Sequence, residues 1–176
     1  MHRIYIQISE HINLYIGKQA GLYPENALLV ALVDEVIDSV EDISGPALDI
    51  AHASKEDKPR QATEFCKEGG TLRYWLDKFV ARIEENAKRG NKNGLFVGDT
   101  LTIADLKFTQ IEFYLISIVP GAQAVLKEDK YKSLMANIDS VKKNEKIKSF
   151  LNEFNDRDYV KKAVGELKKW GIIVVK

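Results

Sequence analysis

Three aspartates recur at four-residue spacing in the most regularly patterned part of the sequence. Asp34, Asp38 and Asp42 fall on one face of a helix if the segment that holds them is helical. Like charges at this spacing cost a helix a few tenths of a kcal/mol per pair. A row of carboxylates therefore suits a surface that meets a cation, such as a ligand ammonium group or a lysine or arginine of a partner. The alternative is a solvated face, which the helix dipole favours near a helix N-terminus.

Other reactive side chains form no recognisable site. His2, His11 and His52 are scattered, and no paired Glu-x-x-His or His-Glu-x-x-His pattern predicts a metal site. The single cysteine, Cys66, excludes an intramolecular disulfide framework and a multi-cysteine zinc site. No phosphate loop or dinucleotide fingerprint occurs. We therefore expect neither a metal nor a cofactor.

Composition narrows the class of protein further. The 176 residues, enough for about one domain with its own core, carry 26 basic and 26 acidic side chains, so binding of nucleic acid through bulk positive charge is not expected. No run of 18 apolar residues predicts a membrane span, and the first residues lack a signal-peptide pattern. The default expectation is a cytoplasmic protein. The charge is uneven, because residues 1–126 hold 13 basic against 18 acidic side chains and residues 127–176 hold 13 against 8.

The elements that must position these residues are predicted to be helices. Apolar residues recur at spacings of three and four over most of the chain, which is typical of amphipathic helices packed into an all-α bundle. Gly45-Pro46 is expected to end or bend the first long helix, and Gly69-Gly70 to introduce a kink or an irregular turn into the second. The predicted helices span residues 26–43, 62–87, 102–118, 129–143, 144–155 and 156–170.

The strongest local signal is the start of a helix. Thr102 and Asp105 have the spacing of a capping box, in which each side chain bonds the backbone N–H of the other residue. Leu101 and Leu106 flank it as a hydrophobic staple. The segment that follows is apolar nearly all round, so we predict a central helix in which Asp105 has a structural role and no catalytic one.

Four segments, in order along the chain, resemble segments of cytosolic glutathione transferases, closest to the sigma, pi, alpha and mu branch. Residues 93–105, NGLFVGDTLTIAD, are similar to the segment that opens the central helix of that family. The other three resemble the exit from its third helix (15–24), its fourth helix (32–43) and a late helix (144–150). The resemblance covers about residues 8–155 and implies the C-terminal-like helical bundle of that family.

The resemblance also implies a domain organisation. Residues 1–20 would be the last helix of a thioredoxin-like N-terminal domain, and residues 21–176 the all-α domain. The complete family conjugates glutathione, its co-substrate, to electrophiles. The Tyr, Ser or Cys that activates the thiol, and a cis-proline, belong to the thioredoxin-like domain, which we expect to be missing. The chain alone is therefore expected to be inactive.

Two residues match glutathione-binding positions of the family. Ser9 matches a serine that binds the γ-glutamyl carboxylate through its hydroxyl and a helix-start amide, although Ile8 stands where the family usually has Gln or Glu. The alternative for Ser9 is a serine in a frayed terminal helix. Asp42 matches an aspartate that reaches the γ-glutamyl ammonium bound in the neighbouring subunit. Glutathione is therefore expected to bind this chain weakly or not at all.

The resemblance suggests a hydrophobic substrate wall as well. Its members would be Val36, Val40, Phe113 and the tail 172–175, each of which could instead pack in the core. Tyr74, Trp75 and Trp170 are expected to be core aromatics.

A second function remains open. Helical domains of this family also serve as non-catalytic interaction modules in translation factor and synthetase assemblies. The apolar positions Ile8, Ile12, Tyr15 and Ile16 share a helix face, and with the tail they predict an exposed patch. Covering about 400 Å² of it would contribute on the order of 10 kcal/mol before the costs of association. We therefore expect a homodimer.

Overall fold

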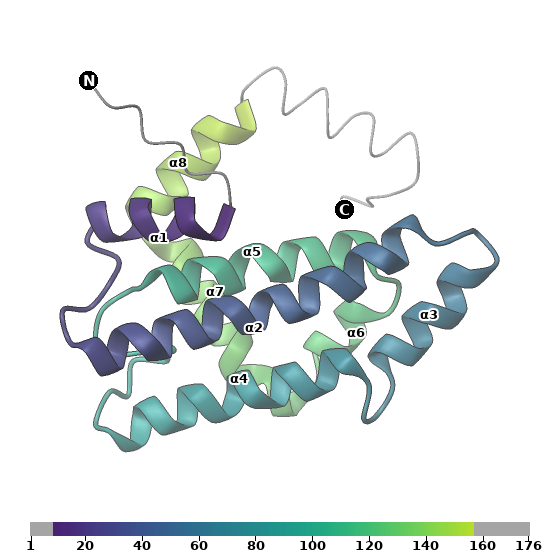
Figure 1. Ribbon diagram of the computed structural model, residues 1–176, viewed down its shortest axis with the longest axis horizontal. Helices are drawn as coiled ribbons and strands as arrows, with labels where there is room; N and C mark the ends of the chain where they lie inside the picture. Colours follow the sequence, from purple (N-terminus) through teal and green to yellow (C-terminus); the bar gives the residue numbers. More distant parts are fainter. Residues whose placement is uncertain (1–8, 157–176) are drawn as a thin grey trace.

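The computed structural model describes residues 9–156, which form only helices, turns and loops. The all-α prediction is thereby confirmed for these residues (Figure 1). Residues 1–8 and 157–176 lie outside the described residues, and with them Ile8, Trp170, the tail 172–175 and all but the first residue of the predicted helix 156–170. The elements are α1 (Ser9–Gln19), α2 (Ala27–His52), α3 (Asp57–Cys66), α4 (Thr71–Lys88), α5 (Ile103–Ile118), α6 (Ala122–Leu126), the 3-10 turn η1 (Asp129–Tyr131), α7 (Lys132–Lys143) and α8 (Glu145–Asp156).

The longest helix, α2, begins where the sequence predicts and ends later. The side chain of Asn26 caps it by accepting hydrogen bonds from the N–H groups of Leu28 (2.9 Å) and Leu29 (3.2 Å). The expectation that the helix ends at Gly45-Pro46 is wrong, because α2 continues through Pro46 to His52. A proline inside a helix costs about 3 kcal/mol. Burial of Ala47 and Ile50 beyond the proline offsets that cost, since one fully buried isoleucine contributes about 1.5–3 kcal/mol.

The second predicted helix is divided into α3 and α4 at the two glycines, as an irregular turn. Gly69 has a φ of +72°, which side chains other than glycine rarely adopt. At Gly70 an added Cβ would lie 2.6 Å from the carbonyl oxygen of Glu64 and 2.7 Å from that of Phe65. Only glycine therefore permits the tight approach that returns α4 along α3.

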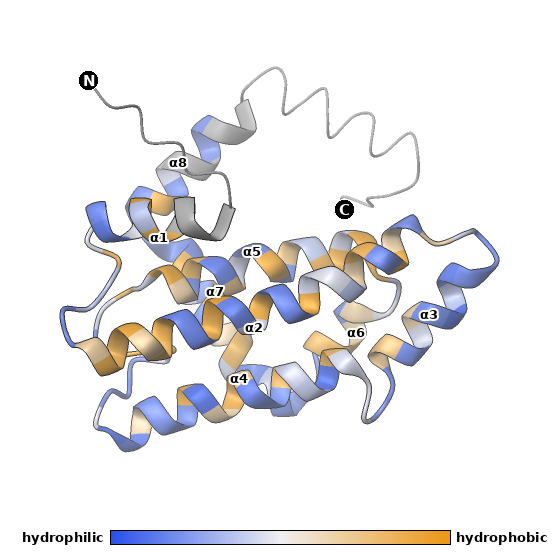
Figure 2. Cartoon of the chain, in the orientation of Figure 1, coloured by the Kyte–Doolittle hydropathy of each residue, from blue (hydrophilic) through white to orange (hydrophobic). Residues whose placement is uncertain are grey.

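Helix α5 is the central element, in contact with α2, α6 and α7. Its Phe108 packs edge to face against Phe79 of α4 and Phe96 of the preceding loop, with ring centroids 5.0 and 5.1 Å apart. Hydrophobic residues recur along α2 and α4 between hydrophilic ones (Figure 2), as expected of helices with one face in this core. In the described part of the chain no helix is both long and apolar enough to cross a membrane.

Two short elements follow α5 before the chain returns along the bundle. Gly121, with a φ of +89°, turns the chain into α6, a five-residue helix that the sequence analysis missed. Tyr131 closes η1 and is fully buried. The bounds predicted for the later segments, 129–143 and 144–155, agree with η1, α7 and α8 to within one residue.

A glycine contact and a backbone hydrogen bond fix the end of α1 and the linker that follows it. Gly17 lets the ring of Tyr23 approach closely, since an added Cβ would lie 3.0 Å from that ring and 3.4 Å from Ile103. The N–H of Ile103 donates to the carbonyl of Leu22 at 3.0 Å. The linker is thereby attached to the start of α5. Tyr15 remains exposed on α1, as does its neighbour Ile16.

Candidate functional site

The three aspartates of α2 share a helix face but differ in their surroundings. Asp34 is half-buried and accepts a hydrogen bond from the Tyr23 hydroxyl at 3.0 Å. The pKa of that hydroxyl is raised strongly, first by burial, then by the hydrogen bond to Asp34 and by the negative charges of Asp34 and Asp38. Asp38 and Asp42 are exposed. The first aspartate of the row therefore has a structural partner within the chain.

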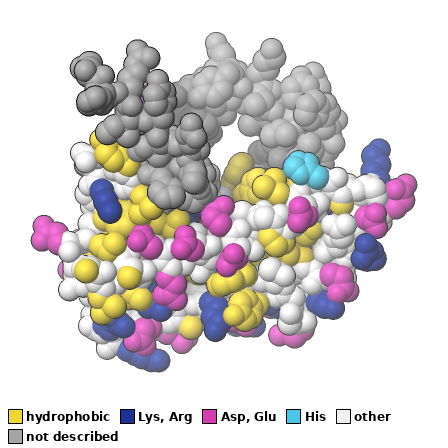
Figure 3. Space-filling model, in the orientation of Figure 1, with side chains coloured by type: hydrophobic (Ala, Val, Ile, Leu, Met, Phe, Trp, Pro, Cys, Tyr) yellow, Lys and Arg dark blue, Asp and Glu magenta, His cyan; other side chains and the backbone are white. Residues whose placement is uncertain are grey.

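The glutamates of the same helix are paired with other helices. Glu35 forms an ion pair with Arg82 of α4 at 3.1 Å, and Glu41 forms one with Lys107 of α5 at 2.6 Å. Asp42, next to Glu41, has no hydrogen bond or ion pair to any residue that the structure describes. Figure 3 shows acidic side chains spread over the middle of this face of the molecule. Asp42 thus presents a carboxylate whose charge is balanced by no neighbour in the described chain.

Ser9 is the first residue of α1, the position at which backbone N–H groups of a helix are free to bind an anion. Its side chain lies outside the part that the structure describes, as do those of the next four residues. The predicted contribution of the Ser9 hydroxyl to glutathione binding therefore stays a prediction.

The proposed members of a substrate wall lie in different environments. Val36 and Val40 are 2% and 1% exposed and belong to the core. Phe113 of α5 is 67% exposed, so the core alternative for this residue is wrong. The core prediction is also wrong for Tyr74, which is 53% exposed, while Trp75 is partly buried against the core. The three wall residues thus do not share one surface in the described chain.

A groove of about 690 Å³ between α2 and α4 was not predicted. Apolar side chains from both helices line it, and charged side chains of both signs surround them. The spacing of Leu32 and Val36 on one helix, and of Trp75 and Phe79 on the other, is the signal that could have revealed it. The charged residues are Glu35, Lys78, Arg82, Glu84, Glu85, Lys88 and Arg89.

The capping box at the start of α5 is present and is part of a larger buried network. Asp105 has no solvent exposure, and its Oδ2 accepts hydrogen bonds from the N–H and the hydroxyl of Thr102, both at 2.9 Å. Its Oδ1 accepts from the N–H of Phe96 at 3.0 Å and from Nδ2 of Asn137, on α7, at 2.8 Å. Four donors thus hold a buried carboxylate away from any ligand, which fits a structural role.

Two buried asparagines hold the loop that leads to this cap. Nδ2 of Asn86 donates to the carbonyls of Leu95 (3.0 Å) and Gly98 (2.8 Å), and its Oδ1 accepts from the N–H of Gly98 at 2.9 Å. Asn137 donates to the carbonyl of Gly94 at 3.0 Å. Sequence reasoning missed both residues, because no local motif places them: the partners of Asn86 lie 9 and 12 residues away and those of Asn137 lie 32 and 43 residues away.

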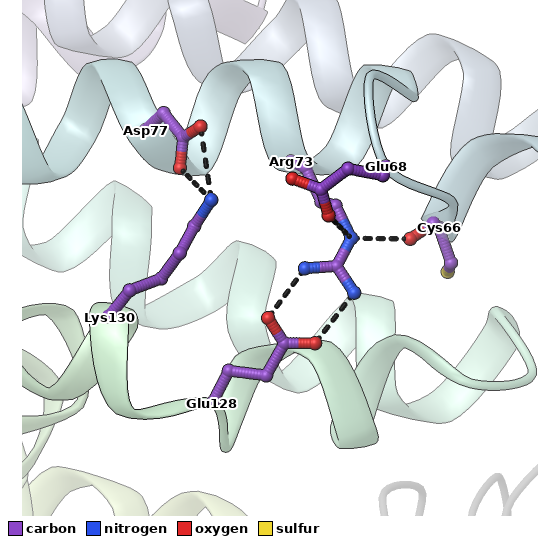
Figure 4. Close-up of polar contacts among 6 residues, drawn as sticks. All are labelled: Cys66, Glu68, Arg73, Asp77, Glu128 and Lys130. Atoms are coloured by element: carbon purple, nitrogen blue, oxygen red, sulfur yellow. Dashed lines mark hydrogen bonds and ion pairs between the residues drawn. The ribbon is translucent and has the colours of Figure 1, made fainter.

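A partly exposed cluster of charges joins α4 to the segment before α7 (Figure 4). Arg73 forms two hydrogen bonds with Glu128, at 2.5 and 2.6 Å, and its Nε donates to the carbonyl of Cys66 at 2.9 Å. Lys130 lies 2.9 Å from Asp77. Every charge in this cluster has an opposite partner, which leaves none to bind a substrate.

Cys66 is a poor nucleophile in this position. Burial raises the pKa of its thiol, although the charge of Arg73 opposes that shift. Its Sγ lies 3.9 Å from the carbonyl oxygen of Pro120. Among the described residues, no three His, Cys, Asp or Glu side chains are grouped so that they could hold a metal ion.

Comparisons with known proteins agree with this helical arrangement. A family model described as "Glutathione S-transferase, C-terminal domain" matches residues 41–153, from the second half of α2 into α8. The matched segment includes Asp42, the capping box and both buried asparagines, but not Ser9. The search of curated proteins found no match.

Several solved structures are similar to this chain. The structure of prostaglandin synthase D of Nilaparvata lugens has 25% identity and a TM-score of 0.69, with 84% of this chain and 68% of that chain covered. A monomeric glutathione S-transferase of the hookworm Necator americanus has 22% identity and a TM-score of 0.66, covering 87% and 71%. A glutathione S-transferase of Ascaris lumbricoides has 24% identity and a TM-score of 0.60, covering 84% and 68%. The last two likenesses show the fold alone.

Proposed function

Because the chain belongs to the glutathione S-transferase family through its C-terminal helical domain, we propose that it is the helical part of a glutathione-conjugating protein. In this role the N-terminus of α1, at Ser9, receives the γ-glutamyl carboxylate of glutathione, and Asp42 receives the γ-glutamyl ammonium of the glutathione bound in the neighbouring subunit. In this proposal residues 9–156 alone do not turn over electrophiles, because the family activates the thiol in a thioredoxin-like domain and no strand occurs among these described residues. We place the protein in the cytoplasm, like the cytosolic members that it resembles.

The unpaired carboxylate of Asp42 is the observation that carries this proposal. The two glutamates of α2 beside this row, Glu35 and Glu41, have ion-pair partners within the bundle, and Asp34 has the Tyr23 hydroxyl. Asp42 is exposed and keeps its charge available to a cation from outside the described chain. An ammonium group is the part of glutathione that such a carboxylate can bind through a charge-assisted hydrogen bond.

Glutathione titrations test the role of Asp42. We expect Asp42→Asn to weaken binding by about fivefold, equivalent to about 1 kcal/mol for an exposed ion pair. Asp49→Asn is the matched control, because Asp49 is also exposed on α2 and also has no partner among the described residues. A glutathione analogue that lacks the γ-glutamyl amine should bind wild type and Asp42→Asn equally.

Two outcomes would contradict the proposal. Equal losses in Asp42→Asn and Asp49→Asn would indicate only a general effect of charge on α2. Turnover of a generic aryl halide by the purified chain at ordinary enzyme rates would contradict the inactivity of the chain alone.

The exposed face of α1 favours a second candidate function, a non-catalytic interaction module. Tyr15 and Ile16 are 57% and 55% exposed although both are large and apolar. Single exposed apolar residues are ordinary on soluble proteins, but two adjacent ones on the first described helix suit a surface that a partner covers. The first candidate partner is a second copy, which gives the homodimer predicted from the sequence.

Sedimentation at micromolar concentration tests self-association. We expect a dimer that Tyr15→Ser together with Ile16→Ser converts to a monomer, because the two substitutions remove apolar surface from the contact. Leu28→Ser is a matched control, since Leu28 is also an exposed apolar residue, on α2. If the wild-type protein is a monomer, and a pull-down with it recovers a translation protein in stoichiometric amount, the result would favour the interaction module over the homodimer.

A further inference from the structure

The loop between α4 and α5 contains an asparagine followed by a glycine, at Asn93 and Gly94. The Asn93 side chain is exposed, and its Oδ1 accepts a hydrogen bond from the N–H of Leu95 at 3.1 Å. Its Nδ2 makes only a long hydrogen bond, 3.3 Å, to the carbonyl of Gly98. The N–H of Gly94 donates to no acceptor among the described residues. The side-chain carbonyl of Asn93 is thus polarised by a hydrogen bond, while the backbone N–H of Gly94 is engaged in none among the described residues.

We propose that Asn93 is a site of spontaneous chemical modification, at which the native loop promotes conversion of asparagine to aspartate and isoaspartate. Three features of the loop favour this reaction. Gly94 has no Cβ to hinder approach of its nitrogen to Cγ of Asn93. Its N–H is not held by another acceptor. The Leu95 N–H points at the oxygen on which negative charge develops, as a donor of an oxyanion hole does.

The reaction needs only water and hydroxide. Hydroxide removes the Gly94 N–H proton, and the nitrogen attacks Cγ of Asn93 to form a tetrahedral oxyanion that accepts from Leu95. The C–N bond to the side-chain nitrogen then breaks and ammonia leaves with a proton from water, which closes a succinimide. Water opens either carbonyl of this ring, giving aspartate or isoaspartate. The sum is asparagine plus water to the acid plus ammonia.

Conversion of Asn93 should disturb the hydrogen bonds at the start of the central helix, α5. The carbonyl of Gly94 accepts from Asn137, and Asn137 also donates to Asp105. Isoaspartate adds one methylene to the main chain between residues 93 and 94 and so shifts the Gly94 carbonyl. Aspartate leaves the main chain unchanged and keeps an acceptor for the Leu95 N–H. The two products should therefore differ in stability.

Peptide mapping by mass spectrometry of the intact, folded protein after incubation at mildly alkaline pH tests the proposal. Asn91, in the same loop but followed by Lys92, is the internal comparison. We expect Asn93 to convert at least about tenfold faster than Asn91, and the rate to rise with pH. The same sample in urea shows whether the native loop promotes or opposes the reaction.

Two variants complete the test. Asn93→Ser keeps an oxygen that can accept from Leu95 and should gain no acidic product at this position. Asn93→Asp reproduces the unlengthened product and should unfold like wild type, whereas the isoaspartate fraction should unfold about 3 °C lower. Slower conversion of Asn93 in the folded protein than in urea would overturn the claim that the native loop promotes the reaction. An isoaspartate fraction as stable as Asn93→Asp would overturn the claim that the two products differ in stability.

Discussion

The loop before α5 and the charged cluster between α4 and the segment before α7 hold the bundle together in different ways. Around Asp105 and Asn86 the polar groups are buried, and their partners are mostly backbone N–H and C=O groups. In the charged cluster the partners are mostly ionised side chains, and the acids Glu128 and Asp77 are 39% and 54% exposed, although Arg73 is 15% exposed (Figure 4). Both regions join segments far apart in the sequence.

This difference indicates in which region the loss of a hydrogen-bond or ion-pair partner lowers the stability of the fold. Water replaces a lost partner at an exposed ion pair, so such pairs contribute little to stability. A buried N–H that loses its acceptor has no replacement and costs about 1–3 kcal/mol. The buried loop should therefore determine the free energy of unfolding far more than the cluster, although the cluster contains the shorter hydrogen bonds.

The largest loss is expected for Asp105→Ala. The substitution leaves the N–H groups of Thr102 and Phe96 and the amide of Asn137 without their acceptor. We expect the free energy of unfolding to fall by roughly 4 kcal/mol in urea denaturation. Asp99→Ala, in the same loop but exposed, should change it by less than about 0.5 kcal/mol. Similar losses in both variants would show that the loop matters and the buried carboxylate does not.

A smaller loss is expected for Asn86→Ala, roughly 2 kcal/mol by the same measurement. It removes the donor to two carbonyls and the acceptor of the Gly98 N–H, but part of this region reaches water. Asn86→Asp should be worse than Asn86→Ala, because it directs a carboxylate at the carbonyl oxygens of Leu95 and Gly98. An aspartate variant that is more stable than the alanine variant would contradict this geometry.

The smallest effect is expected for Glu128→Gln, which removes one charge from the cluster. The hydrogen bonds from Arg73 lower the pKa of Glu128 below its usual range. A carboxylate with a lowered pKa stabilises the folded state above its unfolded pKa, about 4.3, and this contribution is lost as the pH falls through the folded pKa. The small difference between wild type and Glu128→Gln should thus be constant at neutral pH and disappear in acid. Salt should reduce it as well; a gap that grows in acid would reverse the assigned sign.

The parts of the fold that the sequence predicts are those decided by neighbouring residues. The capping spacing of Thr102 and Asp105 and the irregular turn at Gly69-Gly70 are local, and both appear where expected. Pro46 is a local signal too, yet buried side chains beyond it, which no local rule includes, keep α2 intact. Helix α6 escaped because five residues are too few to show a helical period.

The candidate site is less predictable for the same reason. Asp42 and Asp34 look equivalent in the sequence, and only the position of Tyr23 distinguishes the paired aspartate from the unpaired one. Phe113 and Val36 are both apolar residues of long helices, but one faces solvent and the other the core. The spacing of apolar residues predicts which face of a helix each side chain occupies. Whether that face is buried depends on the neighbouring helices.

The hydrogen bond between Leu22 and Ile103 has a consequence for the order of folding. The N–H of Ile103 belongs to the first turn of α5, and its acceptor comes from the linker before α2. A contact between such distant residues requires closure of a long loop, whose entropy must be lost before the contact can form. During synthesis Leu22 leaves the ribosome long before Ile103, so the acceptor is already available when α5 emerges. The linker can thus act as a template on which the central helix starts.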